Sequence, residues 1–408
     1  MEHNLNVKIL KLLNEIAEEN GLKNWEIKVK NDSGKCEGFA SVIVPVDLIC
    51  DNEAVLELIV KIAPGEELRK TIPFEKVFER EVFVYKHVLP AFRQLEVNNR
   101  VVGDKTFTNY AKCYKTSLEN LEEVLIIENL SSEYKLWKKN VPLDDNHIKL
   151  VLQNYAKLHA LSFVLKNENP ALFDTFKSNS EDVYMDIIKK CGTAGIIRNL
   201  ISRVLKSESV RKDLKTFEKL TKFQSEVIDV MSDLINIQAS GDYGVVGHGD
   251  NWTNNMLFKY ENSNGLNELQ DVKFIDWQLS RFGSPVLDLS YFLCTSSGKE
   301  SLKGLNKLLK VYHSRLTQQL AYFKLDVEQI FPWHTLMEHW KKFSKFGLGM
   351  SFLVVNVAVM TEHECPDVER QQNSEDFLKT FEIQSVNDSE YCNRMQYILQ
   401  HFVDTNLL

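Results

Sequence analysis

The sequence predicts an α+β fold in two parts: a small part that is mostly strand, with one key helix, and a large part that is mostly α-helical. Between Trp25 and Asn129, short runs of β-branched and aromatic residues are separated by turn residues, which is typical of strands. From Ser131 onward, apolar residues recur mainly at helical spacing. Since 408 residues suffice for two cores, we expect an N-terminal domain over residues 1–130 and a second domain over residues 131–408.

The first expected element is an amphipathic helix that ends near Gly21. Its inward face would carry apolar residues at helical spacing: Val7, Leu10, Leu13 and Ile16 or Ala17. Charged residues interrupt this stretch, so we do not expect a signal peptide. A strand over residues 26–29 then leads to a glycine-bearing stretch from Ser33 to Ser41, whose backbone N–H groups could bind phosphate. Most loops of this composition are ordinary turns, so both interpretations stay open.

A lysine in an apolar strand is the next feature. The strand expected over Leu56–Ile62 carries Lys61 near its end. A buried ammonium group is costly unless it is paired or its head group reaches solvent. Lys61 therefore either extends to solvent or binds the α- and β-phosphates of a nucleotide. The second interpretation requires a carboxylate partner on a following helix.

Such a partner is available on the one helix expected in this part of the chain. Its apolar residues recur at helical spacing over residues 74–89, and Pro90 should end it. Glu81 lies mid-helix beside the apolar stripe. We therefore predict an ion pair between Glu81 and Lys61, with Glu79 as the alternative partner.

A short buried strand over Leu125–Ile127 ends at Glu128, Asn129 and Leu130. The chain is expected to cross between its two parts at this strand-to-loop step. Backbone groups of Glu128 and Leu130 would then face the edge of an adenine ring. We predict that both residues help to bind the nucleotide.

The segment over residues 245–292 carries the strongest functional signal. A short strand runs into Asp250, and Asn255 follows just before a second strand. A third strand, over residues 272–275, ends at Asp276. Because a turn joins the second and third strands into a hairpin, Asn255 and Asp276 return to the same end, close to Asp250. Three oxygen-bearing side chains are therefore expected to converge.

This set of side chains suits phosphoryl transfer. Mg²⁺ prefers oxygen ligands and usually takes only one or two from protein, which fits Asn255 and Asp276. Asp250 would stand clear of the metal and accept the proton of an attacking hydroxyl. The pattern H-G-D-x-x-x-x-N, followed later by a hydrophobic residue and Asp, matches the kinase catalytic loop and metal-binding Asp. We therefore predict that Asp250 and Asp276 are catalytic, and that Asn255 and Asp276 bind the metal.

Each of these residues also has a purely structural interpretation. Asp and Asn are ordinary turn residues, and His248 could be a core histidine bonded to backbone. The spacing of these residues together at strand ends favours a functional site, because a motif is a stronger signal when its structural context agrees with it.

For two further residues we favour structural roles. His159 would be a hydrogen-bonded core histidine without an accompanying acid, and Asp288 would be the N-cap of a helix over Leu289–Cys294.

The composition narrows the class of protein. A net charge of −8 without a basic stripe makes nucleic acid an unexpected partner. Seven scattered cysteines without a C-x-x-C pair argue against a zinc site or a disulfide framework, and for a reducing compartment. The longest apolar run, over residues 347–360, is too short to span a bilayer. We expect a soluble, cytoplasmic protein with no membrane partner.

The acceptor of the phosphoryl group is expected to be a small molecule. Only residues 277–287 separate Asp276 from Asp288, which is too short for the peptide platform that protein kinases form after the metal-binding Asp. The helical regions would instead enclose a pocket. Aromatic residues in these regions favour an apolar or ring-bearing acceptor: Trp252, Trp277, Trp333 and Trp340.

Five stretches together resemble the insect ecdysteroid kinase-like family, relatives of choline kinases and aminoglycoside phosphotransferases. They are HGDNWTNNMLF, FIDWQLSRFGSPVLDLSYF, VKIAP, FEREVFVY and LIIENL, and the resemblance runs from about residue 34 to residue 292. It implies a protein-kinase-like two-lobed fold and ATP-dependent phosphorylation of a hydroxyl on a small molecule, such as an ecdysteroid or a xenobiotic compound. By matching motif, it implies these roles: Lys61 and Glu81 as the phosphate-anchoring pair, Glu128 to Leu130 as the adenine hinge, Asp250 as the base, and Asn255 and Asp276 as metal ligands.

From the sequence we therefore expect a small-molecule kinase that uses ATP and Mg²⁺. A catalytically silent pseudokinase that binds a ligand or a partner protein is the alternative. It would require a defect among the catalytic residues, and the positions named above show none. A metal-dependent phosphohydrolase is a second alternative. A phosphohydrolase would require several histidine metal ligands, whereas His248 is the only histidine next to these acidic residues in the sequence.

Overall fold

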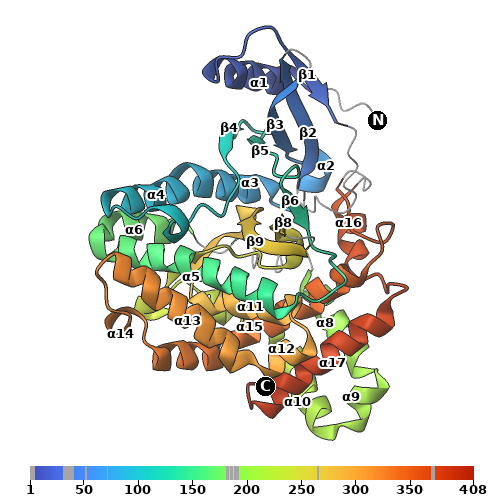
Figure 1. The fold of residues 1–408 in the computed structure, drawn as a ribbon. Coiled ribbons are helices and arrows are strands. Elements are labelled where there is room, and N and C mark those ends of the chain that lie inside the picture. The colour runs from blue at the N-terminus through green and yellow to red at the C-terminus, as the bar shows by residue number, and fades with distance from the viewer. Residues whose placement is uncertain are drawn as a thin grey trace.

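The computed structural model describes most of the chain: residues 5–30, 41–50, 53–70, 72–180, 183, 187, 193–263, 266–368 and 373–408. The fold is α+β, with a small antiparallel sheet in the N-terminal part and helices in most of the remainder (Figure 1). Residues 33–40 of the expected phosphate-binding stretch lie outside the described residues.

The N-terminal sheet has five antiparallel strands in the order β1-β2-β3-β5-β4. Their bounds are β1 Trp25–Val29, β2 Val42–Cys50, β3 Glu53–Ile62, β4 Cys113–Ser117 and β5 Val124–Glu128. Helix α1 (Val7–Glu19) packs on one face, where Leu58 and Val60 of β3 join its core. Since side chains alternate along a strand, Ile59 and Lys61 point to the opposite face. Lys61 is thereby directed away from α1.

The inward face of α1 differs from the expected one. Its buried residues are Ile9, Leu13, Ile16 and Ala17. Val7 is 85% exposed, and Leu10 is also exposed. The reason is the helical spacing. Residues four, seven and eight positions after Ile9 lie on the same face of the helix as Ile9. Val7 lies about 200° around the helix axis from Ile9 and therefore faces the other side. Expecting Val7 and Leu10 to face inward was wrong.

The helix expected over residues 74–89 does not end at Pro90. Helix α3 (Phe74–Phe83) continues through a π-helical turn, η1 (Val84–Val88), into α4 (Leu89–Asn98). Proline lacks the N–H group that an α-helix uses, and its ring clashes with the carbonyl one turn earlier. The wider π turn, in which Leu89 N–H donates to Val84 O, accommodates Pro90 and lets the helix continue.

The larger part of the chain holds two small antiparallel sheets. Strand β6 (Tyr134–Leu136) pairs with β8 (Met256–Ser263), which pairs with β9 (Leu266–Phe274). Strand β7 (Val245–Gly247) pairs with β10 (Arg281–Gly283). The hairpin expected around residues 256–275 is thus present as β8 and β9, and its two ends meet where Met256 faces Phe274.

Helices make up the rest of this part. They are α5 Asp145–Glu168, α6 Pro170–Ser178, α8 Thr193–Leu205, α9 Glu208–Lys212, α10 Leu214–Ile235, α11 Pro285–Ser296, α12 Lys299–Lys303, α13 Leu305–Tyr322, α14 Val327–Ile330, α15 Trp333–Val359, α16 Ser374–Thr380 and α17 Asp388–Asp404. The N-terminal part adds the short helix α2 (Glu66–Arg69), and short 3₁₀ turns lie at η2 Gly103–Lys105, η3 Gly241–Tyr243, η4 Thr253–Asn255 and η5 Trp277–Leu279.

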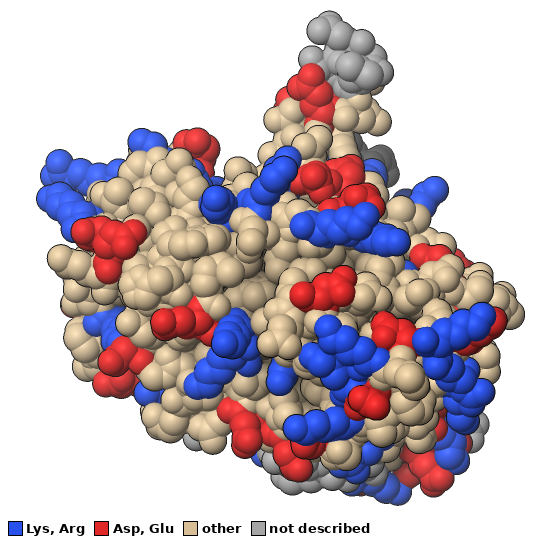
Figure 2. Space-filling model, turned by 90° about the horizontal axis from the view of Figure 1, so that it is seen from below, with Lys and Arg blue, Asp and Glu red and all other residues tan. Residues whose placement is uncertain are grey.

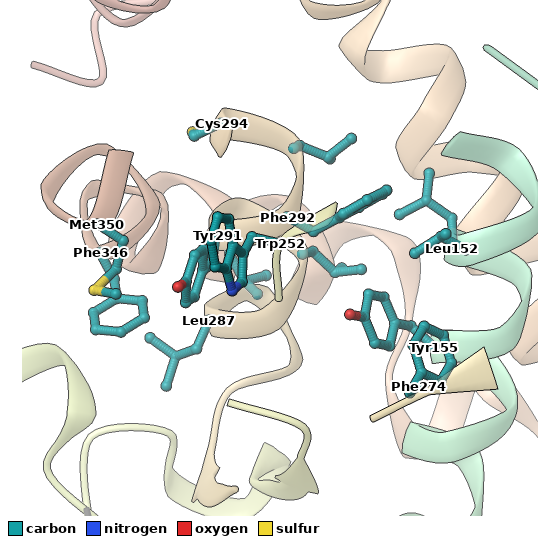
Figure 3. Packing of buried hydrophobic residues seen from close by; sticks show 14 of the residues in the cluster. Leu152, Tyr155, Trp252, Phe274, Leu287, Tyr291, Phe292, Cys294, Phe346 and Met350 are labelled. Atoms are coloured by element: carbon teal, nitrogen blue, oxygen red, sulfur yellow. The ribbon is translucent and has the colours of Figure 1, made fainter. Parts of the chain in front are cut away.

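Helices α11 and α15 form the centre of the helical part. All residues of α11 are buried. Gly347 of α15 permits close contact, since a Cβ there would lie 2.3 Å from the backbone of Ser290. Figure 3 shows Tyr291 of α11 facing Phe346 and Met350 of α15. Residues 84–95 join the same apolar cluster, so the division into two domains near residue 130 stays a prediction.

Helix α15 is long and apolar enough to cross a membrane by composition, but 83% of its most apolar window is buried inside the protein. This burial is that of a core helix, as expected from the sequence. On the face shown in Figure 2, acidic and basic side chains are interspersed.

Acid should destabilise this fold partly through His339 of α15. Burial, and then the charge of Lys342, lower the pKa of His339 from 6.5 to about 4. Because the unfolded state binds the proton more readily, the stability from neutral His339 is present above pH 6.5 and is lost as pH falls toward 4. His339→Gln should therefore flatten the fall of Tm between pH 7 and pH 5. The exposed His334 offers the control, and an equal flattening in His334→Gln would contradict this assignment.

Candidate active site

A buried lysine joins three elements of the fold. Lys61 of β3 is 3% exposed, and its Nζ donates to Glu81 Oε2 of α3 at 2.7 Å. The same Nζ contacts Oδ1 of Asp276, at the start of η5. Burial acts to lower the pKa of Lys61, but the charges of Asp276 and Glu81 outweigh it and raise the pKa. The ammonium is therefore charged, and the ion pair expected between Lys61 and Glu81 is present.

Asp276 has a left-handed backbone conformation, with φ 61° and ψ 65°. Residues other than glycine rarely adopt it, although Asp tolerates it better than most. The conformation lets the chain turn sharply from strand β9 into η5. Strain of this kind often marks a functional position.

Asp250 and Asn255 occupy one loop, between β7 and β8. Asp250 Oδ2 accepts from Asn255 Nδ2 at 2.7 Å, and Asp250 Oδ1 accepts from the hydroxyl of Tyr291 at 2.8 Å. Burial raises the pKa of Asp250 to about 6, although the hydrogen bond from Tyr291 opposes the shift. At neutral pH the carboxyl group is therefore mostly ionised and acts as a hydrogen-bond acceptor. Nothing in the sequence pointed to Tyr291, because it lies 41 residues from Asp250.

His248 connects this loop to the segment that follows strand β9 and carries Asp276. Its Nδ1 lies 3.3 Å from the N–H of Asp250, and its Nε2 lies 2.9 Å from the carbonyl oxygen of Ile275. Burial lowers the pKa of His248 to about 4, so the ring is neutral at pH 7. These partners place the proton on Nε2, which donates to Ile275. His248 is thus a buried histidine bonded to backbone, and it orients the residues on either side.

The same loop is held by Asp288, a role that the sequence did not suggest. Asp288 Oδ2 accepts from the N–H of His248 at 2.8 Å, and Oδ1 accepts from the N–H of Gly249 at 3.1 Å and from Asn251 Nδ2 at 2.7 Å. Asp288 is not an N-cap, because Ser284 caps α11. The structural role expected for Asp288 holds, but its position as an N-cap was wrong.

His159 completes this group. Its Nε2 lies 3.1 Å from Asp288 Oδ2, and its Nδ1 lies 3.0 Å from the hydroxyl of Tyr312. Burial alone would raise the pKa of Asp288, but the hydrogen bond and charge of His159 outweigh it and hold the pKa at about 2. His159 is a hydrogen-bonded core histidine, as expected, yet an acid does accompany it. Sequence could not reveal that acid, because 129 residues separate the two.

At the end of strand β5, where adenine is expected to bind, some backbone and side-chain groups already form hydrogen bonds within the chain. The N–H of Asn129 donates to Glu57 O at 2.9 Å, and Leu130 O accepts from the N–H of Tyr134 at 2.9 Å. The carboxylate of Glu128 accepts from the N–H of Lys112 at 3.1 Å. The Glu128 side chain is thus bound to the neighbouring backbone.

A cavity of about 170 Å³ brings the candidate catalytic residues together. Asp250, Asn255 and Asp276 all line it. Most of its wall is apolar and comes from residues 72–77, helix α15 and residues 377–381. Of the four tryptophans considered from the sequence, Trp252 lines the cavity, whereas Trp277, Trp333 and Trp340 do not. Trp277 instead packs against His248 at 4.6 Å between ring centroids.

These features define a protein-kinase-like fold with a kinase-type site. An antiparallel sheet presents a lysine paired with a helix glutamate, and two loops of the helical part bring an Asp, an Asn and a second Asp to the same place. The model of the ecdysteroid kinase-like family matches residues 35–325, well over half of the chain. The chain belongs to this family, and the membership supports a small-molecule kinase.

Three solved structures with some likeness to this chain are distant from it in sequence. An ethanolamine kinase from Plasmodium vivax is 12% identical, with a TM-score of 0.41, over 100% of this chain and 93% of that one. A choline/ethanolamine kinase family protein from Mesorhizobium loti is 10% identical, with a TM-score of 0.35, over 91% and 99%. A glucosamine kinase is 10% identical, with a TM-score of 0.33, over 93% and 80%. We draw no argument from likenesses this low. The comparison with curated proteins found no match.

Gly249 should not tolerate a side chain. Its φ is +86°, and a Cβ at this position would lie 1.8 Å from the carbonyl oxygen of Leu279. We expect Gly249→Ala to lower the free energy of unfolding by at least about 1–3 kcal/mol, the cost of a strained backbone conformation. Chemical denaturation measures this loss. Gly195→Ala, within helix α8 and with open space around its Cβ, is the control and should leave stability unchanged or slightly higher. Equal stabilities for the two variants would contradict the close approach.

Asp288→Asn should disorder the loop that carries Asp250. An amide has one oxygen where the carboxylate has two, and its NH₂ group would face N–H donors. We expect the free energy of unfolding to fall by about 2–3 kcal/mol, as for buried hydrogen bonds to a charged group. Denaturant titration beside the exposed control Asp229→Asn checks this. Unchanged stability in Asp288→Asn would show that the loop does not depend on this carboxylate.

Proposed function

We propose that the protein is an ATP- and Mg²⁺-dependent kinase that phosphorylates a hydroxyl of a steroid-like or xenobiotic small molecule in the cytoplasm. One observation carries the proposal: the Lys61 ammonium contacts both Glu81 and Asp276, and Asp276 shares a cavity with Asp250. These residues would thus supply a phosphate-binding cation, a metal-binding carboxylate and a base within one site. Phosphoryl transfer requires little beyond such positioning and charge.

The nucleotide would bind between the sheet and the helical part. Lys61, held by Glu81, would bind phosphate oxygens. At the adenine edge, the N–H of Asn129 is already donated to Glu57, and the carbonyl of Leu130 already accepts from Tyr134. We therefore assign the N–H of Leu130 as the donor to adenine and the carbonyl of Glu128 as the acceptor.

The donor set fits Mg²⁺. Asn255 donates from its amide nitrogen to Asp250, which leaves its oxygen as the group that can ligate a cation. Asp276 adds a carboxylate, and two protein oxygens are what Mg²⁺ usually takes. Bound there, Mg²⁺ would offset the charge that develops on the transferred phosphoryl group. Among the described residues, no three of His, Cys, Asp and Glu are arranged to hold a metal ion, which disfavours the histidine-rich set of a phosphohydrolase.

Asp250 would orient the acceptor hydroxyl and take its proton. Its two oxygens are fixed by Tyr291 and Asn255, so the carboxylate cannot rotate freely. With a pKa of about 6 it is mostly ionised at pH 7, yet basic enough to accept a proton. The acceptor would enter the apolar cavity beside it. A peptide platform has little room, because helix α11 begins at Pro285, soon after Asp276.

Asp250→Asn should abolish turnover, with a loss of at least about 10²–10⁴-fold, because an amide cannot accept the proton. Nucleotide affinity should stay largely intact, because Lys61 and Asp276 are untouched. ADP production with a panel of steroids and of phenolic and glycosidic alcohols measures turnover, and calorimetry measures nucleotide binding. Asp174→Asn, an exposed change on α6, is the matched control.

Three outcomes would count against this assignment. Loss of nucleotide binding in Asp250→Asn would mean that the residue belongs to the nucleotide site. Nucleotide binding without ADP production by the native protein on any acceptor would favour the pseudokinase. Phosphate release without any acceptor would favour the phosphohydrolase.

A further inference from the structure

We infer that the acceptor is a mainly apolar alcohol or phenol whose reacting hydroxyl is its one polar end, rather than a polyhydroxylated or cationic molecule. This inference rests on the proposed function and specifies the substrate class of the same cavity. It follows from how polar and apolar side chains are distributed around the cavity wall.

Among the described residues that line the cavity, the carboxyl, amide and hydroxyl side chains belong to one connected group. Tyr291 and Asn255 both bond to Asp250, and Gln278 lies in the same short turn as Asp276. Every one of these residues comes from the catalytic loop, from η5 or from the adjacent side of α11. A hydroxyl that reached them would be placed at the base.

The remainder of the described wall is apolar and comes mostly from three separate parts of the chain, with Ile187, Trp252 and Leu279 as further members. Helix α15 contributes Met350, Leu353, Val354 and Val357, and the N-terminal part contributes Ile72, Phe74 and Val77. The segment around α16 adds Phe377, Leu378 and Phe381. Phe377 also packs with Ile72 and Phe74 in one small apolar cluster, so this wall is continuous from α16 to the N-terminal part.

A second hydroxyl on the acceptor would lack a side-chain partner along the described part of this wall. The walls on α3, α15 and α16 present aliphatic and aromatic side chains, and the backbone groups inside these helices are bonded within the helix. Burying an unpaired hydroxyl loses the hydrogen bonds that it made with water. Such an acceptor should therefore react about tenfold less efficiently for each misplaced hydroxyl.

A positively charged acceptor would also lack a counter-charge. Among the described lining residues, the acidic groups are Asp250 and Asp276. Asp276 already contacts Lys61, and Asp250 faces the reacting hydroxyl. A quaternary ammonium or an amino sugar would have to leave water for a wall in which only aromatic rings, such as Phe74 and Phe377, could face its charge, and such a cation–π contact offsets only part of the cost of burying an unpaired charge.

A matched pair of alcohols tests the inference. We expect kcat/KM for octan-1-ol to exceed that for octane-1,8-diol by about tenfold, because the far hydroxyl of the diol would be buried unpaired. Choline should react more slowly than either. A monohydroxylated sterol should likewise be preferred over a polyhydroxylated steroid with the same ring skeleton. Calorimetry with a non-hydrolysable ATP analogue present measures binding of the same compounds without turnover.

A single substitution should change this preference. Leu353 is half-buried and faces the cavity, so Leu353→Asn would offer a partner to the far hydroxyl. We expect the gap between octan-1-ol and the diol to narrow to about threefold or less in this variant. Leu325→Asn is the control, at a half-buried leucine that does not line the cavity, and it should keep the native preference.

These outcomes distinguish failure of the inferred acceptor class from failure of the proposed kinase function. Turnover that favours the diol, choline or a polyhydroxylated steroid would overturn the inference and leave the kinase function standing. Binding that favours octan-1-ol without turnover of any acceptor would support the cavity's selectivity and overturn the proposed function. An absence of binding by every alcohol would overturn the inference.

Discussion

The account depends on the charge of Lys61 being buried between two carboxylates. A buried ammonium is tolerated only with close partners, and removing a partner from such a pair typically costs about 3–5 kcal/mol. Glu81 belongs to helix α3 and Asp276 to the turn after β9, so both must be held in place for Lys61 to remain buried. The interaction therefore aligns the N-terminal sheet with the loops of the helical part. The same alignment places Asp276 and Asp250 in one cavity.

Much of this arrangement could be predicted because it follows from local rules. A lone lysine in an apolar strand needs a carboxylate, and Glu81 was the mid-helix candidate beside the apolar stripe. A hairpin returns the chain to its starting end, which brings Asn255 and Asp276 together. The α+β fold followed from the change in apolar periodicity near residue 130. Each of these predictions used residues close in sequence or a single turn.

The features that sequence missed depend on distant parts of the chain or on unusual backbone. Asp288 looked like an N-cap, because nothing local shows that a carboxylate will accept three groups from a loop 37–40 residues away. Pro90 failed to end its helix because a π turn accommodates it, and no residue type specifies that turn. The acceptor wall combines Phe74, Leu353 and Phe377, which only the folded chain brings together. Periodicity identifies such residues as apolar without saying which cavity they line.

A crystal structure with a non-hydrolysable ATP analogue and Mg²⁺ would test the central claim most directly. The account predicts that the Lys61 ammonium keeps its contact with Glu81 and binds phosphate oxygens. It also predicts a cation ligated by Asn255 and Asp276, with Asp250 facing the apolar cavity. A nucleotide bound elsewhere, or phosphates that lie far from Lys61 and Asp276, would contradict it.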